Sequence, residues 1–131
     1  MAKTILVSPK VSRIAPGRIM SQGVKAGQLV FASGQVARNA QGQTVGKGDI
    51  EVQTRQTLEN VKAVLEAGGA TMDDVVKVTI FVTNIKDHFD QTHKVRAEFW
   101  KKDYPASTLV EVKALANPDL LIEIEATAVI Q

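Results

Sequence analysis

The chain has 131 residues, 44% hydrophobic and 23% charged, and this composition predicts one domain, residues 1–131, with a buried core. The net charge is only +2 and the basic residues are scattered, so nothing indicates the basic patch of a nucleic-acid-binding protein. The absence of cysteine excludes thiolate nucleophiles, cysteine-bound metals and disulfides.

The first half of the chain predicts strands followed by a helix. Residues 1–27 are punctuated by proline and glycine and read as irregular, with residues 5–7 as a candidate edge strand. Residues 28–34, QLVFASG, predict a strand that ends at a glycine. Asp49 is a candidate N-cap for a helix over 50–67, whose apolar residues recur at helical spacing, and Gly68-Gly69 predicts its end.

The second half adds three strands and a helix. The run VVKVTIFVT, residues 75–83, is nearly continuous in β-branched and apolar residues, which is typical of an interior strand. Asp87 is expected to open a second helix over about 88–101, and Pro105 to introduce a strand over 107–114. Asn117-Pro118-Asp119 predicts a turn into the last strand. This order predicts an α+β domain with two helices on one face of a mixed sheet.

The last strand carries two carboxylates among aliphatic residues. Alternation places Glu123 and Glu125 on a mixed face with Leu121 and Val129, while the opposite face is apolar and should meet the helices. A carboxylate in a partly buried cleft gains a raised pKa and can act as a general acid or base. Alternatively, the two acids only solvate the sheet, and this stretch alone favours that interpretation. Apolar residues on the mixed face suggest a neighbouring subunit.

Other motifs give little support to a metal site, a cofactor or a membrane segment. His88 and His93 are five residues apart, unlike the i, i+4 zinc pair, and have no obvious third ligand. Phosphate-binding glycine loops and the GxSxG nucleophile motif are absent. No run approaches the ~20 apolar residues of a membrane span, and the start of the chain does not resemble a signal peptide. We therefore expect a cytoplasmic protein without a metal site.

Five segments together resemble the RidA/YjgF family of reactive-intermediate deaminases, also called L-PSP endoribonuclease-like proteins. The resemblance covers about residues 17–129, and the segments follow the family's order and spacing. They are SQGVKAGQLVFASGQ (21–35), GDIEVQTRQTLENVKAVLEAGGATMDDVVKVTIFV (48–82), RAEFW (96–100), YPASTLVEV (104–112) and LIEIEATAV (121–129).

The resemblance implies a chorismate-mutase-like fold and a homotrimer whose sheets form a barrel-like centre. A small molecule would bind in the cleft between subunits, where an enamine or imine is hydrolysed to a 2-keto acid and ammonia without a cofactor. Glu123 matches the family's cleft carboxylate, and Glu125 matches an acid of structural role. The implied substrate-binding residues are Met20, Ser33, Gly34, His93, Ser107 and Thr108.

The sequence departs from the family pattern inside the implied cleft. Ser107 stands where active members carry an arginine that binds the substrate carboxylate in a bidentate manner. Met20 stands in place of a loop aromatic residue, and His93 in place of a helix asparagine. Losing this arginine should lower kcat/KM on amino-acid-derived imines at least ~10- to 100-fold. Arg18 and His93 are candidate replacement cations.

Three functions follow in order of preference. The first is hydrolytic deamination of an altered, less anionic enamine or imine, with weak or absent activity on 2-aminoacrylate. The second is a trimer that binds a metabolite without turnover. The third is an endoribonuclease or translation inhibitor, which lacks both a basic groove and a well-spaced histidine pair.

Overall fold

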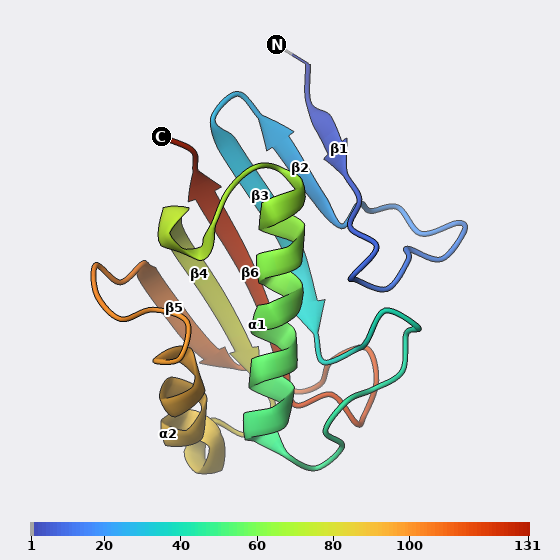
Figure 1. Cartoon of the computed structure of the whole chain (residues 1–131). Helices are drawn as coiled ribbons and strands as arrows, with labels where there is room; N and C mark the ends of the chain where they lie inside the picture. Colours follow the sequence, from blue (N-terminus) through green and yellow to red (C-terminus); the bar gives the residue numbers. More distant parts are fainter. Residues whose placement is uncertain (1) are drawn as a thin grey trace.

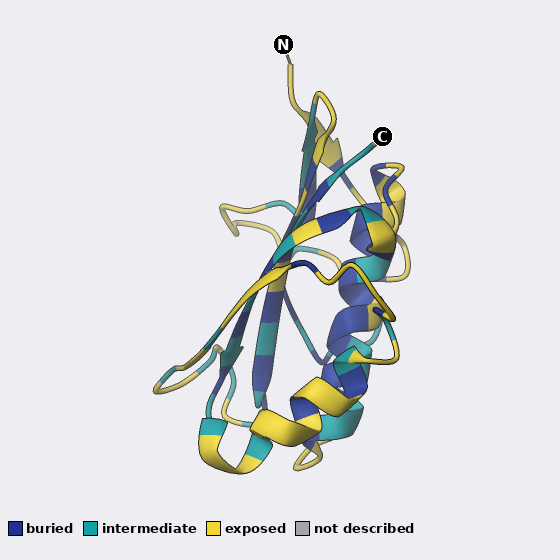
Figure 2. Ribbon diagram, turned by 90° about the vertical axis from the view of Figure 1, so that its left-hand side faces the viewer, coloured by how far each residue is buried: buried dark blue, intermediate teal, exposed yellow. Residues whose placement is uncertain are grey.

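A six-stranded sheet with two helices on one face makes up the computed structural model, which describes residues 2–131 (Figures 1 and 2). The elements, in chain order, are β1 (Thr4–Leu6), β2 (Gly23–Ala26), β3 (Leu29–Val36), α1 (Ile50–Ala67), the short 3₁₀ helix η1 (Met72–Asp74), β4 (Val75–Val82), α2 (Ile85–Arg96), β5 (Ala106–Glu111) and β6 (Ile122–Val129). The predicted α+β arrangement is confirmed.

The strands lie in the order β1-β2-β3-β6-β4-β5, and within residues 2–131 only β4 and β5 pair in parallel. The last strand of the chain is therefore inserted between β3 and β4, which α1 connects, and this is a split βαβ arrangement. β4 has a neighbour on each side, as its continuous apolar sequence predicted. The position of β6 at the centre of the sheet means that its two acids cannot lie on an edge.

The first helix begins and ends where local chemistry dictates. The Asp49 side chain accepts a hydrogen bond from the Val52 amide at 3.1 Å, which confirms the predicted N-cap. At the other end Gly69 adopts a positive φ of 86°, and the amide of Ala70 donates back to the Leu65 carbonyl. The bounds 50–67 predicted from the sequence are confirmed.

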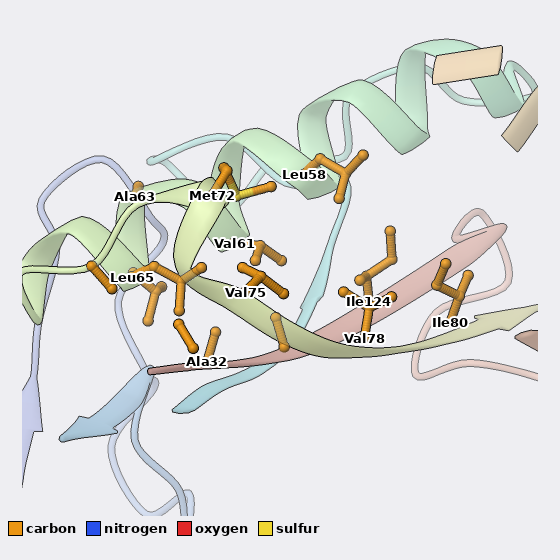
Figure 3. Packing of buried hydrophobic residues seen from close by; sticks show 14 of the residues in the cluster. Ala32, Leu58, Val61, Ala63, Leu65, Met72, Val75, Val78, Ile80 and Ile124 are labelled. Atoms are coloured by element: carbon orange, nitrogen blue, oxygen red, sulfur yellow. The ribbon is translucent and has the colours of Figure 1, made fainter. Parts of the chain in front are cut away.

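The core lies between α1 and the sheet (Figure 3). Leu58, Val61 and Leu65 of α1 are fully buried against Val78 and Ile80 of β4 and the apolar face of β6. In β6 the exposed and buried residues alternate, so the predicted apolar face does meet the helices. Neither helix in the described part of the chain combines the length and apolarity needed to cross a membrane.

One strand and several boundaries differ from the sequence predictions; β3, for example, does not end at Gly34 but continues to Val36. Residues 23–26 form β2, a hairpin partner of β3, in a region predicted to be irregular. The glycine at position 23 does not break this strand but allows close packing, because a Cβ there would meet the Phe31 carbonyl oxygen at 2.7 Å. The parallel strand is β5, residues 106–111, which is shorter than the predicted 107–114.

The second helix starts earlier than predicted. Asn84 is its N-cap and accepts from the Asp87 amide at 3.1 Å, so Asp87 lies in the first turn of α2 instead of before it. The helix ends at Arg96, and Trp100, predicted to lie within it, follows as a buried anchor. The indole of Trp100 donates to the Met72 carbonyl at 2.9 Å. α2 packs against α1 beside the edge strand β5 (Figure 1).

Candidate active site

Glu123 lies on the sheet face that the helices leave uncovered. It pairs with Val36 of β3 and Phe81 of β4, while its neighbours Ile122 and Ile124 are fully buried on the helix side. Strand alternation therefore directs the Glu123 side chain away from α1. Figure 2 shows that no helix covers this face of the sheet.

The Glu123 carboxyl is half-buried and has no ion-pair partner within residues 2–131. Burial raises its pKa above the ordinary range of a carboxyl group, and the negative charge of Glu125 adds to the effect. The protonated and ionised forms of this group are therefore closer in free energy than those of a solvated glutamate. Such a group suits the exchange of a proton with a bound water.

Gly34 provides the space that the Glu123 carboxyl occupies. A Cβ built at residue 34 would lie only 2.9 Å from the Glu123 Cδ and 3.1 Å from its Cγ. The close approach occurs where the β3–β6 register shifts between Ala32 and Gln35, a β-bulge in the strand. Gly34 therefore sets the position of the acid.

Ser33 precedes Gly34 in β3, and Met20 lies in the loop that Ser33 holds. The Ser33 hydroxyl donates to the Ser21 carbonyl at 2.6 Å, so it holds the preceding loop against β3. Met20, in that loop, is half-exposed and lines a cleft of about 280 Å³ together with Gly34 and Arg18. Gly34 contacts the Glu123 carboxyl and also lines this cleft, so we call the predicted residues Met20, Ser33, Gly34 and Glu123 the acid half-site.

His93 and Ser107 lie elsewhere, in a pocket of about 580 Å³ between α2 and β5. The His93 Nδ1 lies 3.0 Å from the Phe89 carbonyl oxygen, and the two rings are 4.4 Å apart. The pocket, which we call the α2–β5 pocket, is lined by Phe89, His93, Arg96, Ala97, Trp100, Tyr104, Pro105, Ser107 and Leu109.

Arg96 is a residue of this pocket that the sequence predictions missed. It reaches from the last turn of α2 to β5, where its Nη2 donates to the Ser107 hydroxyl at 3.0 Å. A guanidinium thus lies against Ser107, the position at which the family resemblance led us to expect an arginine. The sequence signal was the spacing of three residues between His93 and Arg96, which puts both on one side of a helix.

Thr108 lies on the opposite face of β5 from Ser107. Its hydroxyl accepts a hydrogen bond from the Lys77 Nζ at 2.7 Å, on the face that also carries Glu125 opposite Thr79. Adjacent strand residues point to opposite faces, so Ser107 and Thr108 do not share a pocket within one subunit. Glu125 itself is exposed.

The acid half-site and the α2–β5 pocket are also on opposite faces of the sheet. Ser107 pairs with Val78, which is fully buried under the helices, whereas Glu123 pairs with Phe81 on the uncovered face. A chemical step that needs both sets of residues therefore requires two subunits. Within residues 2–131 no group of three potential metal ligands comes together, and none of the named side chains suggests a cofactor site.

Comparisons with known proteins agree with this architecture. Residues 11–130 match the family model for endoribonuclease L-PSP. A RutC family protein of Pyrococcus horikoshii is 45% identical over 108 residues, which are 82% of this chain and 84% of the relative. A 2-iminobutanoate/2-iminopropanoate deaminase of Salmonella typhimurium is 39% identical and covers 98% of both chains.

A solved structure is similar over nearly the whole length. The crystal structure of Escherichia coli TdcF with bound serine has a TM-score of 0.87 and 33% sequence identity, covering 98% of this chain and 99% of that one. The sequence match and the shared fold confirm the resemblance noted from the five segments. The chain therefore belongs to the endoribonuclease L-PSP family, which is the RidA/YjgF family.

Proposed function

We propose that this protein hydrolyses an imine or enamine of a small metabolite in a cleft between two subunits. The observation that carries the proposal is the Glu123 carboxyl, which is half-buried over Gly34, has a raised pKa and has no paired cation among the described residues. Relatives named 2-iminobutanoate/2-iminopropanoate deaminase, which match 98% of the chain, support the reaction class.

The reaction needs little from the protein. The Glu123 carboxylate orients a water and accepts its proton, while the water oxygen forms a bond to the electrophilic imine carbon. The carbinolamine then collapses: its C–N bond breaks, the nitrogen takes up the protons and ammonia leaves. A carbonyl compound remains, with no net oxidation or reduction. The Ser33-Gly34 backbone would help to hold the substrate beside the acid.

A homotrimer supplies the second half of the site. The uncovered face of the sheet carries several partly exposed apolar side chains that a neighbouring subunit would bury, namely Leu29, Phe31, Val76 and Val110. Such a contact would bring the acid half-site of one subunit towards the α2–β5 pocket of the next. The trimer and a cytoplasmic location remain predictions.

One substitution distinguishes an enzyme from a protein that binds the metabolite without turnover. Glu123→Gln keeps the shape of the side chain but removes its basicity. An enzyme would lose at least about 100-fold in kcat with its ligand affinity largely intact, whereas a binder would keep all measured behaviour. The serine bound to the TdcF relative gives the alternative, a metabolite-binding trimer, its specific support.

The test is release of ammonia and of the 2-keto acid from imines generated in situ by an amino-acid oxidase. We expect acceleration over buffer for at least one imino acid and little for 2-aminoacrylate, because Ser107 alters the substrate site. If the wild-type protein accelerates none of the imines and Glu123→Gln changes nothing, the proposal fails.

A further inference from the structure

The Arg96 guanidinium is a partly buried cation without an anionic partner in residues 2–131. Its Nη2 donates to the neutral Ser107 hydroxyl, and its buried Nε has no hydrogen-bond partner. Desolvation lowers the pKa of Arg96, but an arginine stays charged in proteins. A partly buried, unneutralised charge whose Nε donor is buried and unused destabilises the folded state unless an anion binds it.

Aromatic side chains form the rest of the pocket beside this charge. The rings of Phe89 and His93 lie against each other, and the Trp100 indole is fixed by its bond to the Met72 carbonyl. Tyr104 is largely exposed at the rim. At about 580 Å³ the pocket has the size of a typical small-molecule site and exceeds what a methyl side chain would fill.

We propose that Arg96 binds the carboxylate of the substrate and that the α2–β5 pocket receives a large apolar or aromatic side chain. The preferred substrates are then 2-imino acids derived from bulky amino acids. The inference rests on the proposed deaminase function. It replaces the expectation of a less anionic substrate, because the charge that Ser107 cannot provide is present on the neighbouring helix.

Arg18 is the rival cation that the sequence suggested. It is exposed in the loop before Met20 and lines the cleft beside Gly34, not the α2–β5 pocket. An exposed arginine keeps its hydration and loses little when no anion is bound. Arg96 differs because its Nε has already been removed from water.

Binding of a stable analogue tests the clamp without catalysis. We would measure the Kd of 3-phenylpropanoate and of the neutral 3-phenylpropanol by calorimetry with the wild type, Arg96→Gln, Arg96→Lys, Arg18→Gln and Lys86→Gln. Lys86 is exposed in the first turn of the same helix, so its variant matches the loss of one charge. Arg96→Gln should weaken the acid about 10- to 100-fold and leave the alcohol unchanged, which also shows that the pocket is folded.

Kinetics then test the substrate class. Imines formed in situ from alanine and phenylalanine are compared, and we expect the phenylalanine imine to have the larger kcat/KM by about tenfold or more. Arg96→Gln should raise KM for this imine, with partial recovery in Arg96→Lys and no change in Lys86→Gln. A preference for the alanine imine, or an unaltered KM in Arg96→Gln, would overturn the proposal.

Mixed trimers show whether the acid and the clamp act in one site. Glu123→Gln and Arg96→Gln chains are co-produced with different tags and the mixed species is purified. In every mixed cyclic trimer one of the three interfaces combines an intact acid with an intact Arg96, so about a third of the wild-type activity should return. No recovery would show that the two residues do not meet across an interface.

The outcomes separate the two proposals. If no imine is hydrolysed but Arg96→Gln still loses the phenylpropanoate, the deaminase function fails and the anion clamp stands. If imines are hydrolysed but Arg18→Gln, and not Arg96→Gln, loses the acid, the function stands and this inference fails.

Discussion

Replacing Gly34 by alanine displaces the Glu123 carboxyl without opening the fold. The added Cβ would lie 2.9 Å from the Glu123 Cδ, whereas an ordinary carbon–carbon contact is about 3.5–4.0 Å. The carboxyl must therefore retreat by roughly 0.6–1 Å. The backbone imposes no penalty of its own, because Gly34 does not adopt a positive φ.

The expected effects on rate and stability differ strongly. A misplacement of about 1 Å can cost roughly 100-fold in rate, which corresponds to about 2.7 kcal/mol in the activation barrier. The colliding atoms belong to the movable end of a side chain, so the clash can be relieved without moving the backbone. Replacing glycine by alanine also reduces the entropy of the unfolded chain, which stabilises the folded state by about 0.4–1 kcal/mol. The melting temperature should therefore stay constant or rise slightly.

The assay is imine hydrolysis with thermal unfolding measured in parallel. Glu123→Ala and the double variant Gly34→Ala/Glu123→Ala form a cycle that isolates the collision. If alanine acts only by moving the carboxyl, it should cost nothing further once that carboxyl is gone. Wild-type activity in Gly34→Ala, or an equal loss in both backgrounds, would refute the reasoning.

Three further predictions concern pH, stability and assembly. If ionised Glu123 is the base, kcat should fall as pH drops through its raised pKa. The raised pKa also means that folding favours the protonated carboxyl, so stability is lost as pH rises through the same range. Glu123→Gln should therefore remove the fall of kcat at low pH and should melt at a higher temperature than the wild type near pH ~7. Gln53→Leu removes hydrogen bonds of 2.8 Å to the Asp119 carbonyl and 2.9 Å from the Leu121 amide, and should destabilise by about 3 kcal/mol in denaturant titrations. Phe31→Asp charges the uncovered sheet face and should yield inactive monomers in sedimentation experiments, whereas an active trimer would contradict the proposed interface.

Local signals explain which elements the sequence predicted. The bounds of α1 follow from one capping aspartate and a glycine pair, both of which act within a few residues. The start of α2 was misplaced because Asn84 and Asp87 are both good capping residues, and their side chains also bond to each other at 3.0 Å. The strand β2 was missed because its glycine matters only through contact with β3 and α1, which are distant in sequence.

The candidate site divides in the same way. Alternation along β6 was enough to place Glu123 on the mixed face, and its burial depends on the strand's position in the sheet. Arg96 escaped notice because its role depends on the packing of α2 beside β5, which brings it to Ser107. Thr108 stays a prediction: one-residue steps in a strand reverse the face, so within one subunit it lies apart from Ser107.

If Arg96 takes the role that the family resemblance gives to an arginine at position 107, the shape of the site changes more than its charge. An arginine at position 107 would extend from β5 into the α2–β5 pocket, which Ser107 lines. Arg96 instead extends from α2 and meets β5 only at its tip, so the aromatic wall of Phe89 and Trp100 lies next to the charge. Because an anion and an apolar group can then be bound side by side, the same hydrolysis would select larger imino acids without any change in the acid that activates water.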